Sequence, residues 1–439
     1  MAHLGVLCYH GAGHLNPLIA LSRELASRGH AVTFFLPSDM ESQIREQGLG
    51  FVPIDVSRIE PKVDSSGLKN HATSEWHEDL RARLCRFDQE IGVYIREYLA
   101  AISDSGIDAL LMGEITLTGP TVAEILHIPY CVVSTSIPHN FGWDARRALP
   151  PRRTGQKECD ARIFEVTIFS MKGPVLQILN RHRREMGLES LSDIGATFPE
   201  LAHVTQWPKC LDIERQELPE RFFYAGPFVD EMGRCSVDFP WHKLNGQPLI
   251  YASLGTTRKA DPEIYQRIAS ACAGLNLQLV ITLGGRRNLE SFANLPGNPI
   301  VVANAPQLDL LKRADLVITH AGPNTVLETL LSGLPMLALP LALDQPAVAA
   351  RLETLGLAEV LSVQHCSEWE IRAAVLRLLT ESRFRESATA VQSQLQSLCG
   401  AKQAASILER AIANHTQIPS FTSQETAQSD MQVTSVAPS

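Results

Sequence analysis

Residues 319–345 read THAGPNTVLETLLSGLPMLALPLALDQ, and the fold class can be worked out from this stretch. The preceding apolar run at 316–320, LVITH, predicts a short buried strand. Gly322 follows in a turn, and the apolar spacing of 324–332 then predicts a helix. The PMLALP run behind it predicts the next strand. A strand, a glycine turn, a helix and a second strand make one unit of a parallel sheet covered by helices.

The same alternation extends along the rest of the chain. After an apolar run at 3–9, apolar residues at helical spacing continue to Gly29, which predicts a helix that ends there. A segment rich in glycine, proline and charge at 226–248 has the composition of a linker. The strands expected before it are 3–9, 30–37, 51–54, 108–113 and 130–135, and those expected after it are 248–255, 277–285, 298–304, 316–320 and 335–340. Two βα-repeating halves imply an α/β fold with two sheets that face a cleft.

The composition narrows the classes of partner and compartment. The chain has 439 residues, 45 % of them hydrophobic, and its net charge of −9 argues against nucleic acid as the main partner. Its nine cysteines include no Cys-x-x-Cys pair, so we expect reduced thiols in a cytoplasmic protein. We expect no signal peptide, because polar residues and glycines come too early in MAHLGVLCYHGAGHLNP. We expect no membrane span, because no run of about 18 apolar residues is free of charge and proline. The arginines at 146–153 predict a solvated face, with peripheral contact with an anionic membrane surface as the alternative.

The turn after the LVITH strand has the chemistry of an anion site. The N-terminus of the next helix offers free N–H groups and a partial positive charge, and Gly322 lets a phosphate approach the backbone. His320, Asn324 and Thr325 can add hydrogen bonds, and Glu328 can reach a sugar diol one turn further on. The alternative is that His320 and Asn324 only cap a structural helix.

Three further segments are expected at the same edge of the second sheet. Asp344 and Gln345 follow the PMLALP strand, and a carboxylate beside an amide can accept from and donate to sugar hydroxyls. ASLGT at 252–256 and NAPQ at 304–307 each follow another expected strand. Because ligands bind at the carboxyl ends of parallel strands, these segments predict one shared ligand site.

The ordered set of these motifs resembles a known signature. NAPQ, THAGPNTVLE and GLPMLALPLALDQ together resemble the nucleotide-sugar signature of the family 1 UDP-dependent glycosyltransferases, which have the GT-B fold of two Rossmann-like domains. The N-terminal segments GHLNPLIALSRELASRGHAVTF and GPTVAEILHIPY resemble the bacterial branch that contains zeaxanthin glucosyltransferases and macrolide glycosyltransferases. The resemblance covers roughly residues 3–410.

The resemblance implies a role for each matched position. The positions matched to the base and ribose are Asn304, Ala305, Gln307 and Glu328; those matched to the diphosphate are His320, Gly322, Asn324 and Thr325, with Ser253, Gly255 and Thr256 beside it; those matched to the sugar are Asp344 and Gln345. The terminal glutamine implies glucose as the sugar. Family members usually carry tryptophan at the first position, and Asn304 offers far less surface for base stacking, so UDP and TDP both stay open.

His14 in GAGHLNP is the candidate general base. It is expected in the loop after the first strand, facing the cleft, where an imidazole can take a hydroxyl proton near neutral pH. The resemblance gives His14 the same role, whereas the nearby His10 does not match. The orienting aspartate of the family matches Gly113, so we expect its neighbour Glu114 to orient His14. A solvated loop glutamate is the alternative.

We expect no metal cofactor, because the chain contains no Asp-x-Asp triplet to hold a metal-bound diphosphate. The N-terminus of the 324–332 helix is expected to stabilise the leaving group instead. A base on one domain and a donor on the other imply attack from the face opposite the leaving group. That arrangement predicts an inverting mechanism.

The resemblance also divides the chain. The expected parts are an acceptor-binding domain at 1–228, a linker at 229–247, a nucleotide-sugar-binding domain at 248–400, a helix at 401–415 that crosses back to the first domain, and a disordered tail at 416–439. Phe141 and Trp143 are the candidate acceptor contacts. Aromatic rings there suit a flat or elongated apolar alcohol or phenol of the carotenoid, flavonoid or macrolide type.

The sequence thus predicts a hexosyltransferase that moves glucose from a UDP-sugar to a hydroxyl of an apolar small molecule. Two alternatives are a nucleotide-sugar 2-epimerase with the same fold and a non-catalytic partner subunit that binds nucleotide sugars. A dinucleotide dehydrogenase is not expected, because GAGHLN lacks the final glycine of the G-x-G-x-x-G pattern.

Overall fold

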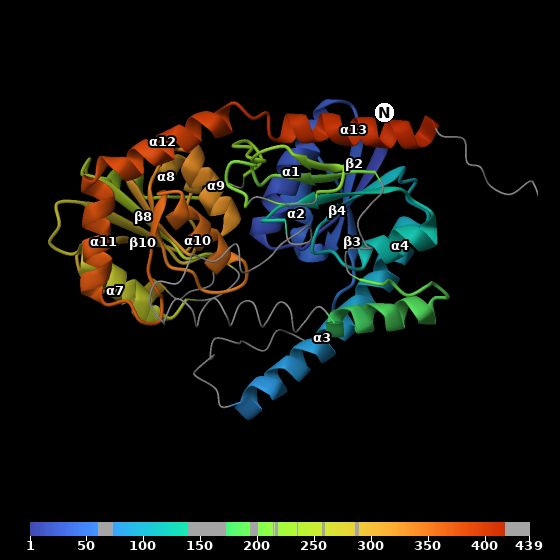
Figure 1. Cartoon of the computed structure of the whole chain (residues 1–439), viewed down its shortest axis with the longest axis horizontal. Helices are drawn as coiled ribbons and strands as arrows, with labels where there is room; N and C mark the ends of the chain where they lie inside the picture. Colours follow the sequence, from blue (N-terminus) through green and yellow to red (C-terminus); the bar gives the residue numbers. More distant parts are fainter. Residues whose placement is uncertain are drawn as a thin grey trace, which may run out of the picture.

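The computed structural model describes residues 1–59, 73–138, 173–193, 201–213, 215, 218–234, 236–256, 260–285 and 289–417. These residues form two lobes, each built on a parallel sheet with helices on both faces (Figure 1). This confirms the expected α/β class with two Rossmann-like units. Among the described residues, no helix is long and apolar enough to cross a membrane.

The sheet of the N-terminal lobe has the strand order β3-β2-β1-β4-β5-β6-β7, with neighbours parallel throughout. Its strands are β1 (His3–Leu7), β2 (Ala31–Pro37), β3 (Gly50–Ile54), β4 (Ala109–Gly113), β5 (Tyr130–Ser134), β6 (His203–Thr205) and β7 (Phe222–Tyr224). The five strands expected in this half are confirmed. The strands β6 and β7 were not predicted from the sequence.

Helices cover both faces of this sheet. They are α1 (Ala12–Ser27), α2 (Glu41–Arg45), α3 (Thr73–Ile102), α4 (Gly119–Leu126) and a helix over 173–185. The apolar stripe of α1, with Leu15, Leu18 and Ile19, is buried against one face of the sheet. Ile95 and Tyr98 of α3 are buried against the other face. Gly29, with a φ of 92°, follows the end of α1 as expected.

The sheet of the C-terminal lobe has the order β10-β9-β8-β11-β12-β13 and is also parallel throughout. Its strands are β8 (Leu249–Ser253), β9 (Gln278–Thr282), β10 (Ile300–Val302), β11 (Leu316–Thr319), β12 (Met336–Ala338) and β13 (Ala358–Val360). Its helices are α7 (Pro262–Cys272), α8 (Gln307–Leu311), α9 (Pro323–Leu331), α10 (Gln345–Thr354), α11 (Glu368–Thr380) and α12 (Ser382–Gln396). The five strands expected in this half are confirmed.

The last described helix, α13 (Ala401–Gln417), returns to the N-terminal lobe. Ala404 and Leu408 are buried in the same core as α1, and Arg28 of the α1 C-terminus pairs with Glu409 at 2.8 Å. In Figure 1 this helix, in red, lies along the lobe that carries the blue N-terminal strands. The helix runs two residues past the expected boundary at 415, and residues 418–439 of the expected tail lie outside the described residues.

The chain passes between the lobes twice, and the two passages touch. Gly226, just after β7, has a φ of 92°, and a Cβ atom there would lie 2.8 Å from the Cβ of Leu398. A Cβ at Gly400 would lie 2.1 Å from the carbonyl oxygen of Pro227. Only glycine permits such an approach at these positions. The first passage continues through 225–248, where no described residue belongs to a strand.

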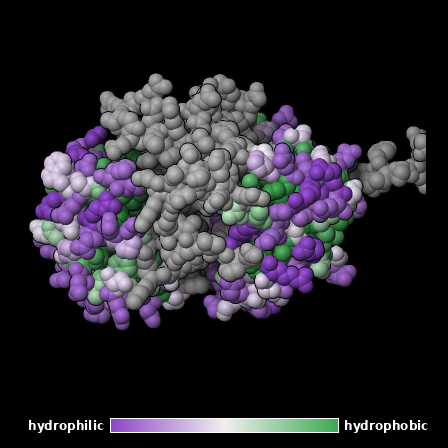
Figure 2. All heavy atoms as spheres, turned by 90° about the horizontal axis from the view of Figure 1, so that it is seen from below, coloured by the Kyte–Doolittle hydropathy of each residue, from purple (hydrophilic) through white to green (hydrophobic). Residues whose placement is uncertain are grey.

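On the face shown in Figure 2, hydrophilic side chains dominate the outer surface of both lobes, and apolar residues are scattered among them. The cores lie beneath, one cluster on each face of each sheet. One contact between the lobes lies where the helices α1 and α9 begin, after the carboxyl ends of β1 and β11. Asn324, in the first turn of α9, donates from Nδ2 to the carbonyl oxygen of Gly13, in the first turn of α1, at 2.7 Å.

Candidate active site

The turn between β11 and α9 carries backbone strain. Ala321 is fully buried and has a φ of 63°, a region that residues with a Cβ rarely adopt. Leu343, immediately before Asp344, has a φ of 59° and is 53 % exposed. Such outliers cluster at ligand sites, where the surrounding structure enforces them. Both of these adjoin residues that the sequence assigns to the donor.

Two glycines enclose the ring of His320. A Cβ at Gly255 would lie 2.6 Å from the His320 Nε2 atom, and one at Gly322 would lie 2.5 Å from it. Both positions therefore require glycine for the imidazole to fit. The expected function of Gly322, to admit a phosphate to the backbone, remains a prediction.

His320 is held as a neutral ring. Burial lowers its pKa to about 4. Its Nδ1 atom is buried and has no hydrogen-bond partner within the described part of the chain. At neutral pH His320 can therefore act on a phosphate as a hydrogen-bond group but not as a cation.

The predicted ribose residues Gln307 and Glu328 are in contact. Gln307 donates from Nε2 to Glu328 Oε2 at 2.6 Å, and its Oε1 accepts from the Tyr251 hydroxyl at 3.1 Å. Glu328 is only 3 % exposed. Its other oxygen pairs with the Arg234 guanidinium, which comes from the linker. This role of Arg234 was not predicted from the sequence, since no motif surrounds this residue in the linker.

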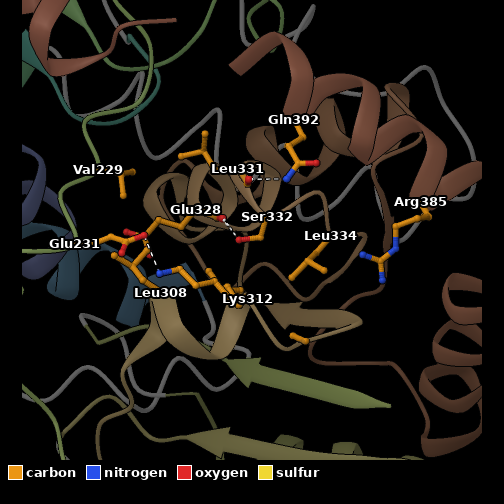
Figure 3. A pocket seen from close by; sticks show the side chains of 12 residues that line it. Val229, Glu231, Leu308, Lys312, Glu328, Leu331, Ser332, Leu334, Arg385 and Gln392 are labelled. Carbon is orange, nitrogen blue, oxygen red and sulfur yellow. Dashed lines mark hydrogen bonds and ion pairs between the residues drawn. The ribbon is translucent and has the colours of Figure 1, made fainter. Parts of the chain in front are cut away.

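A cavity of about 530 Å³ lies beside Glu328. Its lining comes from the linker, from α8 and α9, and from α12, as Figure 3 shows. The Lys312 ammonium points to Glu231 of the linker, with 2.8 Å between Nζ and Oε1. Glu328, a residue predicted to bind the ribose, is on its wall, so this cavity borders the predicted ribose position.

The residues assigned to the sugar lie at the start of α10. Burial raises the pKa of the Asp344 carboxyl to about 6. Gln345 is buried, and its Oε1 accepts from the backbone N–H groups of Leu341 and Ala342 at 2.8 and 3.0 Å. Gln345 therefore fixes the loop before α10 and keeps an amide N–H₂ group that can donate to a ligand.

The remaining donor candidates lie on neighbouring strand ends. Ser253 is buried at the end of β8, and Thr256 is exposed three residues later. Asn304 is exposed, and Ala305 is partly buried against the core. A Cβ at Gly285 would lie 3.0 Å from the Asn304 Oδ1 atom, so this side chain lies against the turn that follows β9.

His14 is in the first turn of α1, not in a loop as the sequence suggested. Its Nδ1 atom lies 2.7 Å from Thr135 Oγ1, just beyond β5. Burial lowers the pKa of His14 to about 4, and the positive end of a helix also disfavours an imidazolium ion. The ring is therefore neutral throughout the neutral range and has one unprotonated nitrogen.

The contact expected between His14 and a carboxylate is made by a hydroxyl. Glu114 accepts a hydrogen bond from Ser134 Oγ at 2.5 Å, and Ser134 Oγ also lies 2.6 Å from His203 Nε2. Ser134 directly precedes Thr135, so Glu114 lies one residue away from the group that holds His14. The expectation that Glu114 itself orients the His14 ring is corrected, because the Nδ1 atom of His14 contacts the Thr135 hydroxyl instead.

Asn324, assigned to the diphosphate, contacts the opposite lobe. Besides its bond to the Gly13 carbonyl, its Oδ1 accepts from Gln206 Nε2 at 2.7 Å. Thr325, the next residue, is 9 % exposed. Neither Thr135 nor Gln206 was predicted from the sequence. The hydroxyl run STS at the end of the predicted strand 130–135 was the one signal for Thr135, and Gln206 had none.

The candidate acceptor residues Phe141 and Trp143 lie outside the described residues. The whole of residues 60–72 and 139–172 lies outside them as well.

Comparison with known proteins connects both lobes to glycosyl transfer. The family model described as UDP-glucoronosyl and UDP-glucosyl transferase matches residues 241–397, and the model for the glycosyltransferase family 28 N-terminal domain matches residues 11–137. The zeaxanthin glucosyltransferase of Pantoea ananas is 27 % identical and aligns over 97 % of this chain and 100 % of its own. The zeaxanthin glucosyltransferase of Pseudescherichia vulneris is 28 % identical and aligns over 95 % of this chain and 100 % of its own.

A solved structure, described as that of the glycotransferase of kitacinnamycin, has a TM-score of 0.73 and 23 % identity. It covers 93 % of this chain and 98 % of its own. This similarity shows the two-lobed GT-B fold. The two family models and the relatives matched along nearly the whole length identify the chain as a member of the UDP-glycosyltransferase family of enzymes.

Proposed function

We propose that the chain transfers glucose from a UDP-sugar to a hydroxyl group of an apolar small molecule, with inversion at the anomeric carbon. One observation carries the proposal. The neutral His14, held by Thr135 on one lobe, adjoins the N-terminus of α9 on the other lobe, where Asn324 bonds to Gly13. A base and an anion-binding helix end therefore meet between the lobes.

The proposed reaction has one central proton transfer. Because a general base must offer an unprotonated nitrogen, Nε2 of His14 takes the acceptor proton while Nδ1–H donates to Thr135 Oγ1. The acceptor oxygen then forms a bond to the anomeric carbon. The bond from that carbon to the diphosphate oxygen breaks, and UDP leaves with the electron pair.

The leaving diphosphate would be stabilised by α9. The free N–H groups and the dipole of this helix favour negative charge at its N-terminus, where His320 and Thr325 add neutral hydrogen-bond groups. We propose that this arrangement works without a metal ion. Undiminished activity in excess EDTA would support this, and full restoration by Mg²⁺ after loss in EDTA would contradict it.

The contacts between Gln307, Glu328 and Arg234 support a ribose position for the donor at Glu328. The Glu328 carboxylate keeps lone pairs for ribose hydroxyls, because each carboxylate oxygen can accept more than one hydrogen bond. The glucosyl group would lie by Asp344 and the amide of Gln345, beyond the diphosphate.

For the acceptor we favour a hydroxylated carotenoid. The support is similarity to two zeaxanthin glucosyltransferases along the length of the chain. A phenol of the flavonoid type and a macrolide alcohol are the other candidates. We place the reaction in the cytoplasm. The protein contacts a membrane surface only where the apolar acceptor is delivered. The free thiols of the described cysteines, Cys8 and Cys131 among them, support a reducing compartment.

The test is UDP release from UDP-glucose, with and without zeaxanthin, a flavonol or a macrolide. Release that depends on an acceptor, together with a β-glucoside product, supports the proposal. Epimer formation without acceptor would identify a 2-epimerase, and tight UDP binding without turnover would identify a partner subunit. The matched control is His14→Ala, which should lose transfer by roughly 10²–10⁴-fold while UDP binding, measured by calorimetry, is retained.

A further inference from the structure

Gln206 joins three segments that belong to both lobes. It follows β6 and is 1 % exposed. Its Nε2 donates to the Thr135 carbonyl oxygen and to Asn324 Oδ1, and its Oε1 accepts from the Phe228 backbone N–H at 3.3 Å. All the polar atoms of this buried amide are thus engaged.

These contacts close a ring of hydrogen bonds around the base. From Gln206 the ring runs through Thr135 to His14, along the backbone to Gly13, and through Asn324 back to Gln206. Thr135 takes part twice, since its carbonyl oxygen accepts from Gln206 and its hydroxyl contacts His14. Asn324 is the one member that comes from the C-terminal lobe.

The ring of hydrogen bonds requires an amide side chain at position 206. The carbonyl oxygen of Thr135 and the Oδ1 atom of Asn324 are both acceptors, and a buried acceptor without a donor costs free energy. A glutamine offers two N–H donors on one nitrogen and an acceptor oxygen for Phe228. A glutamate has no N–H to give, and an apolar side chain of equal length has neither group.

We infer that Gln206 is a positioning residue, which makes the orientation of His14 depend on contact between the lobes. With Asn324 in place, the Gln206 amide is fixed, Thr135 is fixed with it, and the His14 ring keeps Nε2 toward the acceptor. Without Asn324, one N–H of Gln206 loses its partner, and the amide that holds the Thr135 carbonyl is less firmly fixed. This inference rests on the proposed function for its catalytic consequence, but not for its structural one.

The kinetic test is a double-mutant cycle. Gln206→Met keeps the length of the side chain and removes its hydrogen bonds, and we expect it to lower kcat at least tenfold with KM for UDP-glucose changed less than about threefold. In a Thr135→Val background the same substitution should lower kcat by less than threefold, because both changes interrupt one path. Full additivity, or an unchanged kcat, would overturn the inference.

A matched control separates this effect from a general loss of packing. Gln278 is partly buried at the amino end of β9, the sheet edge opposite the site, where it donates to the Lys243 carbonyl at 2.7 Å and accepts from the Asn245 backbone N–H at 3.1 Å. Gln278→Met should lower the melting temperature without lowering kcat. If it lowers kcat as much as Gln206→Met does, the kinetic effect is unspecific and the inference is wrong.

A second measurement needs no activity at all. In protein with ¹⁵N-labelled histidine, the His14 signals, assigned by comparison with His14→Gln, report which ring nitrogen carries the proton. We expect an Nδ1–H ring in the wild type and a mixture of tautomers in both Gln206→Met and Asn324→Ala. Unchanged His14 signals in Asn324→Ala would refute the coupling even if Gln206→Met fails to fold. Absence of any glucosyl transfer by the wild type would refute only the proposed function.

Discussion

The Nδ1 atom of His14 lies 2.7 Å from the hydroxyl oxygen of Thr135. A carboxylate in the place of this hydroxyl would add a negative charge beside the ring. A hydroxyl orients the ring but does not stabilise an imidazolium ion by charge. The two effects of an orienting carboxylate, described for catalytic triads, are therefore separated here. Predictions about Thr135 and Glu114 follow from this separation.

Thr135→Val should lower kcat about tenfold or more, because the ring of His14 loses the acceptor that fixes its tautomer. The variant keeps the shape of the side chain. Thr135→Ser keeps the hydroxyl and should retain most of the activity. Steady-state kinetics on all three proteins provides the test, and equal activity of the valine and serine variants would remove Thr135 from the site.

Glu114→Gln should change kcat less than Thr135→Val does. The carboxylate of Glu114 accepts from Ser134, and a glutamine oxygen can accept the same hydrogen bond. Initial rates at saturating donor would measure this. A loss of tens-fold, with normal folding by circular dichroism, would show that the charge of Glu114 acts on His14 after all.

Donor affinity should weaken as the pH falls through about 6. Burial raises the pKa of Asp344 to about 6, so this carboxyl is ionised and a full acceptor above that pH and protonated below it. KM for UDP-glucose, measured from pH 5 to 8, should rise on the acid side. Asp344→Asn should have a high KM that no longer varies over this range, and a wild-type KM that is constant from pH 5 to 8 would contradict the assignment.

The folded protein should lose stability in mild acid. Burial lowers the pKa of His14 to about 4, of His203 to about 3 and of His320 to about 4. The unfolded chain takes up these protons near pH 6.5 and the folded chain only near 4 or below. The contribution of these histidines to the free energy of unfolding is therefore fully present above pH 6.5. It falls as the pH drops toward 4, by up to about 1.4 kcal/mol per pH unit for each histidine.

Asp344 acts with the opposite sign, since its raised pKa makes the folded state bind a proton more tightly between pH 6 and 4. One carboxyl opposes three histidines, so a net loss is expected. Urea unfolding at pH 7.5 and 5.5 measures it, and His203→Gln should flatten the dependence. Equal stability at the two pH values would mean that these rings are not buried in solution.

Asn304→Trp should strengthen binding of uridine nucleotides. Asn304 is exposed at the position matched to base stacking, and stacking of a base on an aromatic ring contributes about 1–3 kcal/mol. That corresponds to a Kd lower by roughly 5- to 150-fold. Calorimetry with UDP on both proteins provides the measurement, and an unchanged Kd would show that the base lies elsewhere.

Much of the fold could be predicted because buried parallel strands are continuous apolar runs separated by glycine turns and amphipathic helices. This holds for β1, β4 and β11, whose ends carry the candidate site. The strands β6, β7 and β13 were not predicted, whereas β10 and β12, which are equally short, lie within the predicted apolar runs 298–304 and 335–340. The donor residues could be proposed because their motif lies within one continuous part of the chain.

The group that orients the base could not be predicted in the same way. Thr135 lies 121 residues from His14, and Gln206 lies 118 residues from Asn324. Contacts over such distances depend on how the sheets and lobes pack, which no local pattern specifies. The sequence led to Glu114 because it adjoins the expected position, whereas the fold turns its carboxylate to Ser134.

The contact between the two passages of chain, at Gly226 with Leu398 and at Gly400 with Pro227, has a mechanical consequence. Two connections packed together behave as a single short hinge rather than as two separate tethers. We therefore expect any opening of the two lobes to occur by rotation about this one hinge. Closure about it should restore the hydrogen bond between Asn324 and the Gly13 carbonyl.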